Sequence, residues 1–180
     1  MQLTQLTNDL NSPWAVDPQP GEKDGHRPLD YAHDVQPAFD NYCQKCHSDA
    51  EPKGNLNLSG KLTEMFNVSY ETLLPSNFDR RYSLLGLIIA KNVPKTGNVE
   101  YLPAKSIGSL TSVLVAMLSK GTFKLGDPKM AERAAKLAEV HKDSKLAPEE
   151  LLKLTNWIDT NCQYYGTYWV RKNLKYKDHP

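Results

Sequence analysis

The chain has 180 residues, of which 39% are hydrophobic, and its formal net charge at pH 7 is +1. This length suggests one domain, with or without long extensions. A nearly neutral chain is not expected to bind nucleic acid or an acidic membrane surface. No apolar run approaches the roughly 18 residues that cross a bilayer, so the sequence predicts no membrane span.

Residues 1–30 are predicted to be an N-terminal extension. They contain residues that interrupt helical or strand periodicity: Pro13, Pro18, Pro20, Gly21 and Pro28. We expect the folded domain to cover residues 31–168. Residues 169–180 form a basic C-terminal tail, and such a tail is more often a solvated end than a docking site.

A helix is predicted to begin near Asp34, with that side chain as its N-cap. Pro37 suits the first turn, where its missing N–H has no cost. The apolar positions that follow have helical spacing: Val35, Phe39, Tyr42 and Cys46. The helix is therefore expected to lead directly into a pair of cysteines.

Cys43, Cys46 and His47 form the sequence Cys-x-x-Cys-His, which is the pattern of covalent haem attachment. Each thiol can add across one haem vinyl group to form a thioether. The two-residue gap on a helical turn lets both sulfurs reach vinyl groups on one edge of the porphyrin. The next residue then places its imidazole under the iron. The motif thus predicts one covalent haem c with His47 as the proximal ligand.

Three other interpretations of the motif are weaker. A zinc site needs further Cys or His residues at a second paired spacing, and the chain offers only Cys162 and scattered histidines. A thioredoxin-like dithiol needs a βαβ context, which the sequence does not contain. A disulfide between Cys43 and Cys46 would leave His47 without a role. Cys162 itself is expected to be a buried small apolar residue, with an intermolecular disulfide as the alternative.

The segment after the motif mixes loops with apolar runs. Residues 53–60 are predicted to be a loop with Leu56 and Leu58 directed inward. Residues 82–93 are the most apolar stretch, and periodicity cannot separate a short helix from a buried strand there. Ser109 is predicted to cap a helix that runs to residue 119. The expected inner face of that helix consists of Leu110, Val113, Leu114 and Met117.

Two further helices are predicted toward the C-terminus. The first, at residues 128–140, is charged and amphipathic, with a thin inner stripe of Ala134, Leu137 and Ala138. The second, at residues 148–160, has a proline and two glutamates in its first turn, where the positive end of the helix dipole favours carboxylates. Its expected inward positions are Leu151, Leu154, Trp157 and Ile158.

The chemistry of a haem depends on the ligand opposite His47. The candidate donors are His26, His33, His141, His179, Met65, Met117 and Met130. His141 has the most favourable context, because it lies between two predicted helices that can both pack on a haem. Met130 is the main competitor, and an open or water-bound site is the third option. A His/His pair lowers the reduction potential relative to a His/Met pair, since thioether sulfur favours ferrous iron.

Two segments resemble known haem domains. Residues 31–47, from Tyr-Ala-His-Asp-Val to Cys-Gln-Lys-Cys-His, resemble the opening of the cytochrome c domains abundant in planctomycetes. Residues 157–166, Trp-Ile-Asp-Thr-Asn-Cys-Gln-Tyr-Tyr-Gly, together with residues 56–58 and 69–73, are similar to the C-terminal haem domain of the hydrazine synthase alpha subunit and its relatives. The resemblance covers residues 30–168 in pieces and implies an electron-relay domain without the catalytic centre.

The same resemblance bears on the distal ligand. In that family a Gly-His pair usually precedes the last helix, and its histidine is the candidate ligand. Here Lys120-Gly121 is followed by Thr122, and the next histidine is His141. Residues 122–140 therefore look like an insertion between the glycine and the histidine.

The sequence thus predicts a mainly α, cytochrome c-like haem domain with long loops and extended termini. Its expected function is one-electron transfer by a single haem c bound by Cys43, Cys46, His47 and His141. It would act as a relay module or subunit of a larger redox complex, with redox proteins, including other haem subunits, as partners. The alternative is a haem enzyme or gas-sensing domain with an open sixth coordination site.

The expected location is extracytoplasmic, in the periplasm or an equivalent compartment, because covalent haem is normally attached outside the cytoplasm. Residues 1–4 lack the basic and apolar regions of a secretory signal. We therefore expect this chain to be a mature or truncated form without its signal peptide or upstream domains.

Overall fold

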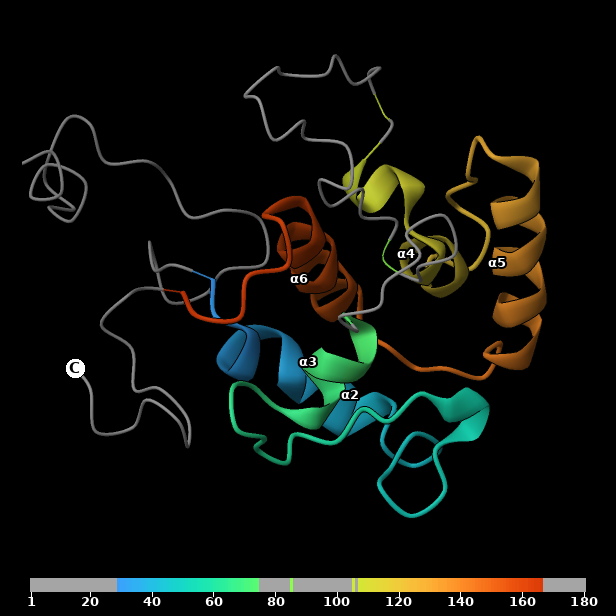
Figure 1. Cartoon of the computed structure of the whole chain (residues 1–180). Coiled ribbons are helices and arrows are strands. Elements are labelled where there is room, and N and C mark those ends of the chain that lie inside the picture. Colours follow the sequence, from blue (N-terminus) through green and yellow to red (C-terminus); the bar gives the residue numbers. More distant parts are fainter. Residues whose placement is uncertain (1–28, 75–84, 86–104, 106, 167–180) are drawn as a thin grey trace, which may run out of the picture.

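The computed structural model describes residues 29–74, 85, 105 and 107–166 (Figure 1). Within these residues the chain forms helices and short helical turns and no β-strand, so the predicted mainly α fold is confirmed. Its cytochrome c-like character stays a prediction. Most of the predicted N-terminal extension, the apolar stretch at 82–93 apart from Leu85, and the basic tail lie outside the described residues. None of the described helices has the length and apolar character needed to cross a membrane.

The first helical segment begins at Asp30, so the predicted N-cap at Asp34 is wrong. The Asp30 carboxylate accepts a hydrogen bond from the backbone N–H of His33 at 3.2 Å, and the Asp34 carboxylate accepts one from the backbone N–H of Asp30 at 2.7 Å. The two carboxylates therefore satisfy N–H groups of the first turn reciprocally. A π-helical turn, η1 (Tyr31–Val35), follows and continues into α2 (Gln36–Tyr42).

The apolar stripe of this segment is shorter than predicted. Val35 and Phe39 are buried, whereas Tyr42 is 39% exposed and Cys46 is exposed. The reason is that α2 ends at Tyr42, so the cysteine motif forms a separate turn with its own orientation.

The remaining elements, in chain order, are the 3-10 turn η2 (Lys53–Asn55), α3 (Val68–Leu73), the 3-10 turn η4 (Gly108–Thr111), α4 (Val113–Leu118), α5 (Pro128–Val140) and α6 (Pro148–Asp159). The helices predicted at 128–140 and 148–160 are confirmed, the second ending one residue earlier. Leu154, Trp157 and Ile158 are buried as predicted, and Leu151 is half-buried. Leu58 is buried and Leu56 half-buried, in agreement with the predicted inward leucines.

The predicted cap at Ser109 is wrong as well. Ser112 caps α4, since its side chain accepts a hydrogen bond from the backbone N–H of Val115. Ser109 lies in η4, where its N–H and its hydroxyl both donate to the carboxylate of Asp159. Because Ser109 is bound to Asp159 of α6, α4 begins later than the helix that the sequence predicts. The same contact leaves Leu110 45% exposed instead of inward, while Val113, Leu114 and Met117 are buried as predicted.

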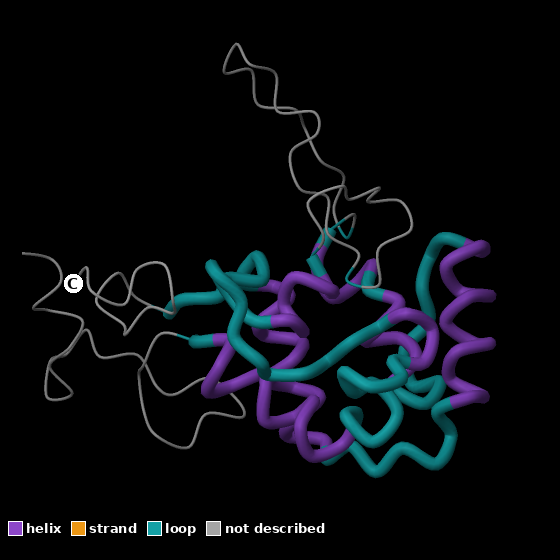
Figure 2. Tube along the Cα trace, turned by 60° about the horizontal axis from the view of Figure 1, so that its bottom comes forward, coloured by secondary structure: helices purple, strands orange, loops and turns teal. Residues whose placement is uncertain are grey.

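Two hydrophobic clusters hold these elements together. The main core surrounds Tyr31, Phe39 and Trp157, each at most 1% exposed, and includes Cys162, which is buried as predicted. The second cluster, which we call the hairpin core, joins α4 and α5 and consists of Val113, Ala116, Leu125 and Ala134. In both views α5 lies at one edge of the described part, beside α4 (Figures 1 and 2).

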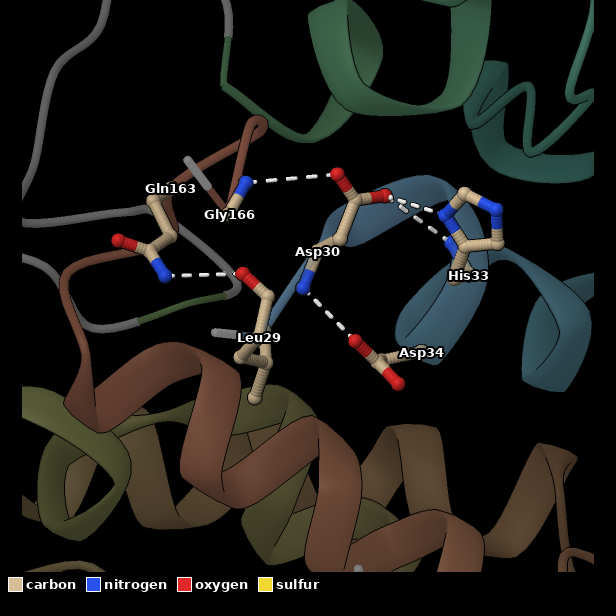
Figure 3. Close-up of polar contacts among 6 residues, drawn as sticks. All are labelled: Leu29, Asp30, His33, Asp34, Gln163 and Gly166. Atoms are coloured by element: carbon tan, nitrogen blue, oxygen red, sulfur yellow. Dashed lines mark hydrogen bonds and ion pairs between the residues drawn. The ribbon is translucent and has the colours of Figure 1, made fainter. Parts of the chain in front are cut away.

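The two ends of the described part lie side by side (Figure 3). The backbone N–H of Tyr31 donates to the carbonyl of Tyr164 at 3.0 Å, and the side chain of Gln163 donates to the carbonyl of Leu29. The Asp30 carboxylate also accepts a hydrogen bond from the N–H of Gly166 at 3.3 Å. The aspartate that caps the first helical turn therefore also fixes the C-terminal segment.

Candidate haem-binding site

The cysteine motif forms a single helical turn after α2. The backbone N–H groups of Cys46 and His47 both donate to the carbonyl of Cys43, each at 3.1 Å. Both thiols are free, with Cys43 half-buried and Cys46 exposed. The turn thus presents two unbridged sulfurs immediately before a histidine, as covalent haem attachment requires.

The Cys43 thiol does not have the low pKa of the reactive cysteine in a redox dithiol. Burial, with a smaller contribution from the neighbouring Cys46, raises the pKa of the Cys43 thiol to about 11. Thioredoxin-like motifs lower the pKa of one cysteine to create a thiolate near neutral pH. The direction of this shift is the opposite, which argues against the dithiol interpretation.

His47 is held by the loop that follows the motif. Its ring Nδ1 lies 3.0 Å from the carbonyl oxygen of Leu56, and its own carbonyl accepts a hydrogen bond from the N–H of Leu58 at 2.8 Å. Leu58 is buried, and its carbonyl accepts a hydrogen bond from the side chain of Gln36 in α2. Because a carbonyl oxygen only accepts, Nδ1 carries a proton, and in the neutral form of the ring Nε2 has a lone pair.

His141 is held in the same way at the end of α5. It is the C-cap of that helix, and its backbone N–H donates to the carbonyls of Leu137 and Ala138. Its ring Nδ1 lies 2.7 Å from the carbonyl oxygen of Leu137, one turn earlier. In the neutral form this ring therefore also carries its proton on Nδ1 and has a lone pair on Nε2.

The structure brings the two histidine rings together. Their centroids are 6.0 Å apart and their planes differ by 8°. Two imidazoles that ligate one metal ion have their nitrogens about 4 Å apart, with the ring centres farther apart, so a centroid separation of 6.0 Å is compatible with such a pair. An ordinary offset aromatic pair can have this separation too. The matched tautomers, with both Nε2 atoms available, are what make the pair suitable for a haem iron.

Three of the other candidate ligands, Met130, Met117 and His33, lie elsewhere in the described part of the chain. Met130 lies in the first turn of α5, at the opposite end from His141, and packs on the hairpin core. Met117 is buried in the main core. His33 is 79% exposed at the junction of the two chain ends, where Asp30 binds its ring nitrogen (Figure 3). His26 and His179 lie outside the described residues.

A cluster of three or more His, Cys, Asp or Glu side chains suited to a metal ion does not occur in the described part of the chain. A structural zinc site needs four such ligands. A haem iron needs only two ligands from the protein, since the porphyrin supplies the rest. The pair of His47 and His141 meets that requirement.

Sequence reasoning missed the groups that orient the two rings. The Leu137 carbonyl precedes His141 by four residues, so the predicted helix over 128–140 already implied that acceptor. The Leu56 carbonyl reaches His47 only through the course of the loop, and no local signal in the sequence identifies it. The sequence does not predict the bond that the Lys120 side chain donates to the carbonyl of Ser144, three residues after His141, either.

Comparison of the chain with protein-family models, with curated proteins and with solved structures gives no match. The resemblance to planctomycete cytochrome c domains therefore stays a prediction from the sequence.

Proposed function

We propose that this chain binds one haem covalently through Cys43 and Cys46, with His47 and His141 as axial iron ligands, and transfers single electrons. The observation that carries the proposal is the near-parallel pair of His47 and His141 rings, 6.0 Å apart, with both Nδ1 atoms hydrogen-bonded to backbone carbonyls. The motif supplies the two thiols, and the fold supplies the second imidazole.

The bound haem would supply reversible one-electron exchange between ferric and ferrous iron. The chain's own residues would determine which state is favoured. The carbonyls of Leu56 and Leu137 accept from Nδ1, which fixes the tautomers and raises the basicity of Nε2. More basic imidazoles stabilise ferric iron, so the reduction potential is expected to be low compared with a His/Met site.

The position of His141 also favours electron transfer over catalysis at the iron. A haem enzyme or gas sensor requires an open sixth position for its substrate or gas. The His141 ring lies 6.0 Å from the His47 ring, centroid to centroid, and belongs to the C-cap residue of α5, which supports its assignment as the sixth ligand. With a haem bound, His141 held in this way would exclude water and exogenous ligands from the iron and would favour simple electron transfer.

We further propose that the chain is a relay module or a subunit of a larger redox complex, with other redox proteins as partners, and that it acts outside the cytoplasm. The support is the covalent haem motif together with the sequence resemblance described above.

The absorption spectrum of the purified protein, ferric and ferrous, with and without carbon monoxide, tests this function. We expect a low-spin spectrum in both oxidation states and slow or absent carbon monoxide binding. A high-spin ferric spectrum with fast carbon monoxide binding would instead establish the enzyme or sensor. A protein that carries no haem after expression with a haem-attachment system would reject both.

A further inference from the structure

We infer that Lys120 is a positioning residue for the distal ligand, holding His141 in place through the loop that follows it. The inference rests on the proposed function, because it concerns how firmly His141 closes the sixth position. It adds a residue that lies outside the haem motif and outside α5.

Two hydrogen bonds connect Lys120 to His141. The Lys120 ammonium donates to the carbonyl of Ser144 at 2.7 Å, a short, charge-assisted bond. The backbone N–H of Ser144 in turn donates to the carbonyl of His141 at 2.9 Å. The side chain of Lys120 thereby ties the turn at residues 141–144 to the end of α4.

The backbone of Lys120 is in an unfavourable conformation for a residue with a Cβ. Its φ is +52°, in the left-handed region, and the next residue, Gly121, has φ +86°. A glycine at position 120 would adopt this conformation with less strain. The strain is offset in part by the Ser144 bond, which glycine cannot make.

The loop that Lys120 secures leads from α5 to α6 (Figure 1). Its residues Lys142, Asp143 and Lys145 are exposed, and Leu146 is the half-buried residue that packs against the main core. The helix before it packs on α4 through the hairpin core, and its last turn also packs on the main core through Leu137 and Ala138. His141 therefore lies where a packed helix meets an exposed loop, and local opening of that loop would release the iron's sixth position.

The rate of carbon monoxide binding to the ferrous holoprotein measures this opening, because the gas binds only when His141 has left the iron. Lys120→Met removes the donor and keeps the aliphatic chain. Lys120→Gly removes the donor and relieves the backbone strain. We expect both to bind carbon monoxide about three to ten times faster than the unmodified protein, with covalent haem content unchanged.

Lys142→Met is the matched control. Lys142 is the neighbour of His141 and carries the same charge, but its ammonium pairs with Glu139 on the surface of α5. Its replacement should leave the rate unchanged. Equal acceleration in this control, or no acceleration in either Lys120 variant, would overturn the inference.

Thermal unfolding separates positioning from general stability. Lys120→Gly should unfold at the same or a higher temperature and still bind carbon monoxide faster. A different result would be faster carbon monoxide binding in Lys120→Met alone, with the increase in rate matching a decrease in unfolding temperature. In that case Lys120 would only stabilise the turn, and the inference would fail. None of these failures affects the proposed haem binding, whereas an unchanged spectrum of the His141→Ala holoprotein would reject His141 as the ligand and leave covalent haem binding standing.

Discussion

His47 and His141 use the same ring nitrogen, Nδ1, to bind a backbone carbonyl, although one carbonyl lies in a loop and the other lies one helical turn earlier. The two imidazoles therefore share one tautomer and both keep Nε2 for a metal. A haem between them would have equivalent ligands on its two faces. The predictions below test that arrangement and the fold that produces it.

The first prediction concerns covalent attachment. Haem should remain with the polypeptide during acid–acetone extraction and in denaturing gels, because two thioethers hold it. Cys43→Ala and Cys46→Ala should each weaken this retention. Cys162→Ala is the control, since the third cysteine is buried in the main core and should leave haem retention intact. Extraction of the haem from the unmodified protein into the organic phase would contradict covalent binding.

The second prediction concerns the distal ligand. His141→Ala should open the sixth position, produce a high-spin ferric spectrum and allow fast carbon monoxide binding. Covalent haem content should not change, because Cys43 and Cys46 are untouched. The visible and near-infrared spectrum of the ferric protein measures the spin state.

Two controls accompany this change. Met130→Ala should leave the spectrum nearly unchanged, since Met130 packs on the hairpin core at the far end of α5. His33→Ala should do the same, since His33 is exposed and bound to Asp30. If Met130→Ala opened the site and His141→Ala did not, the distal ligand would be methionine and the reduction potential would be higher than a bis-histidine haem allows.

The third prediction concerns alkaline pH. Burial raises the pKa of Tyr70 and of Tyr164 to about 12, and it raises that of Tyr31 as well. In the unfolded chain the pKa of each tyrosine hydroxyl is about 10. Below that pH both states hold the protons, so stability does not depend on them. Above it the unfolded chain loses protons first, and the free energy of unfolding should fall as pH rises.

Denaturant unfolding of the holoprotein at a series of pH values measures this loss. Tyr70→Phe should reduce the alkaline slope by removing one titrating group. At about pH 8 it should also cost about 1 kcal/mol, because the Tyr70 hydroxyl donates to the carbonyl of Cys162 at 2.8 Å. If the free energy of unfolding of Tyr70→Phe fell with alkaline pH as steeply as that of the unmodified protein, Tyr70 would not contribute to the pH dependence.

The fourth prediction concerns Gly108, which precedes the contact between η4 and α6. A Cβ at this position would lie 2.5 Å from a carboxylate oxygen of Asp159, and the φ of +75° disfavours any side chain. Gly108→Ala should therefore lower the free energy of unfolding by about 2 kcal/mol or more. Gly121→Ala is the control, since its φ is +86° with no atom near the added Cβ, and it should cost about 1 kcal/mol. If both variants lost the same free energy of unfolding, the close approach to Asp159 would add nothing to the cost of a side chain at position 108.

Local sequence determined the elements whose signals are self-contained. Residues 128–140 begin with a proline and carry an apolar stripe at helical spacing, and α5 has those bounds, with Asp127 as its N-cap. The helix over 148–160 has a first-turn proline and two acidic residues, and α6 ends within one residue of the prediction. The Cys-x-x-Cys-His motif is equally local, because the proposed haem would bind two thiols and an imidazole within one turn of the chain.

Tertiary contacts decided the rest. Asp30 and Asp34 are both good capping residues, and Asp30 is the N-cap in a structure where it also binds the N–H of Gly166. Ser109 binds Asp159, so Ser112 caps α4 instead.

The distal ligand is the clearest case. Sequence spacing favoured His141 over Met130 but could not place either one near His47. The placement depends on the packing of α5 against α4 and on the loop that carries the Leu56 carbonyl, and neither contact has a local signature. Local signals determine helix ends and motifs because they depend on neighbours within a turn, whereas a ligand pair from distant segments depends on how those segments pack.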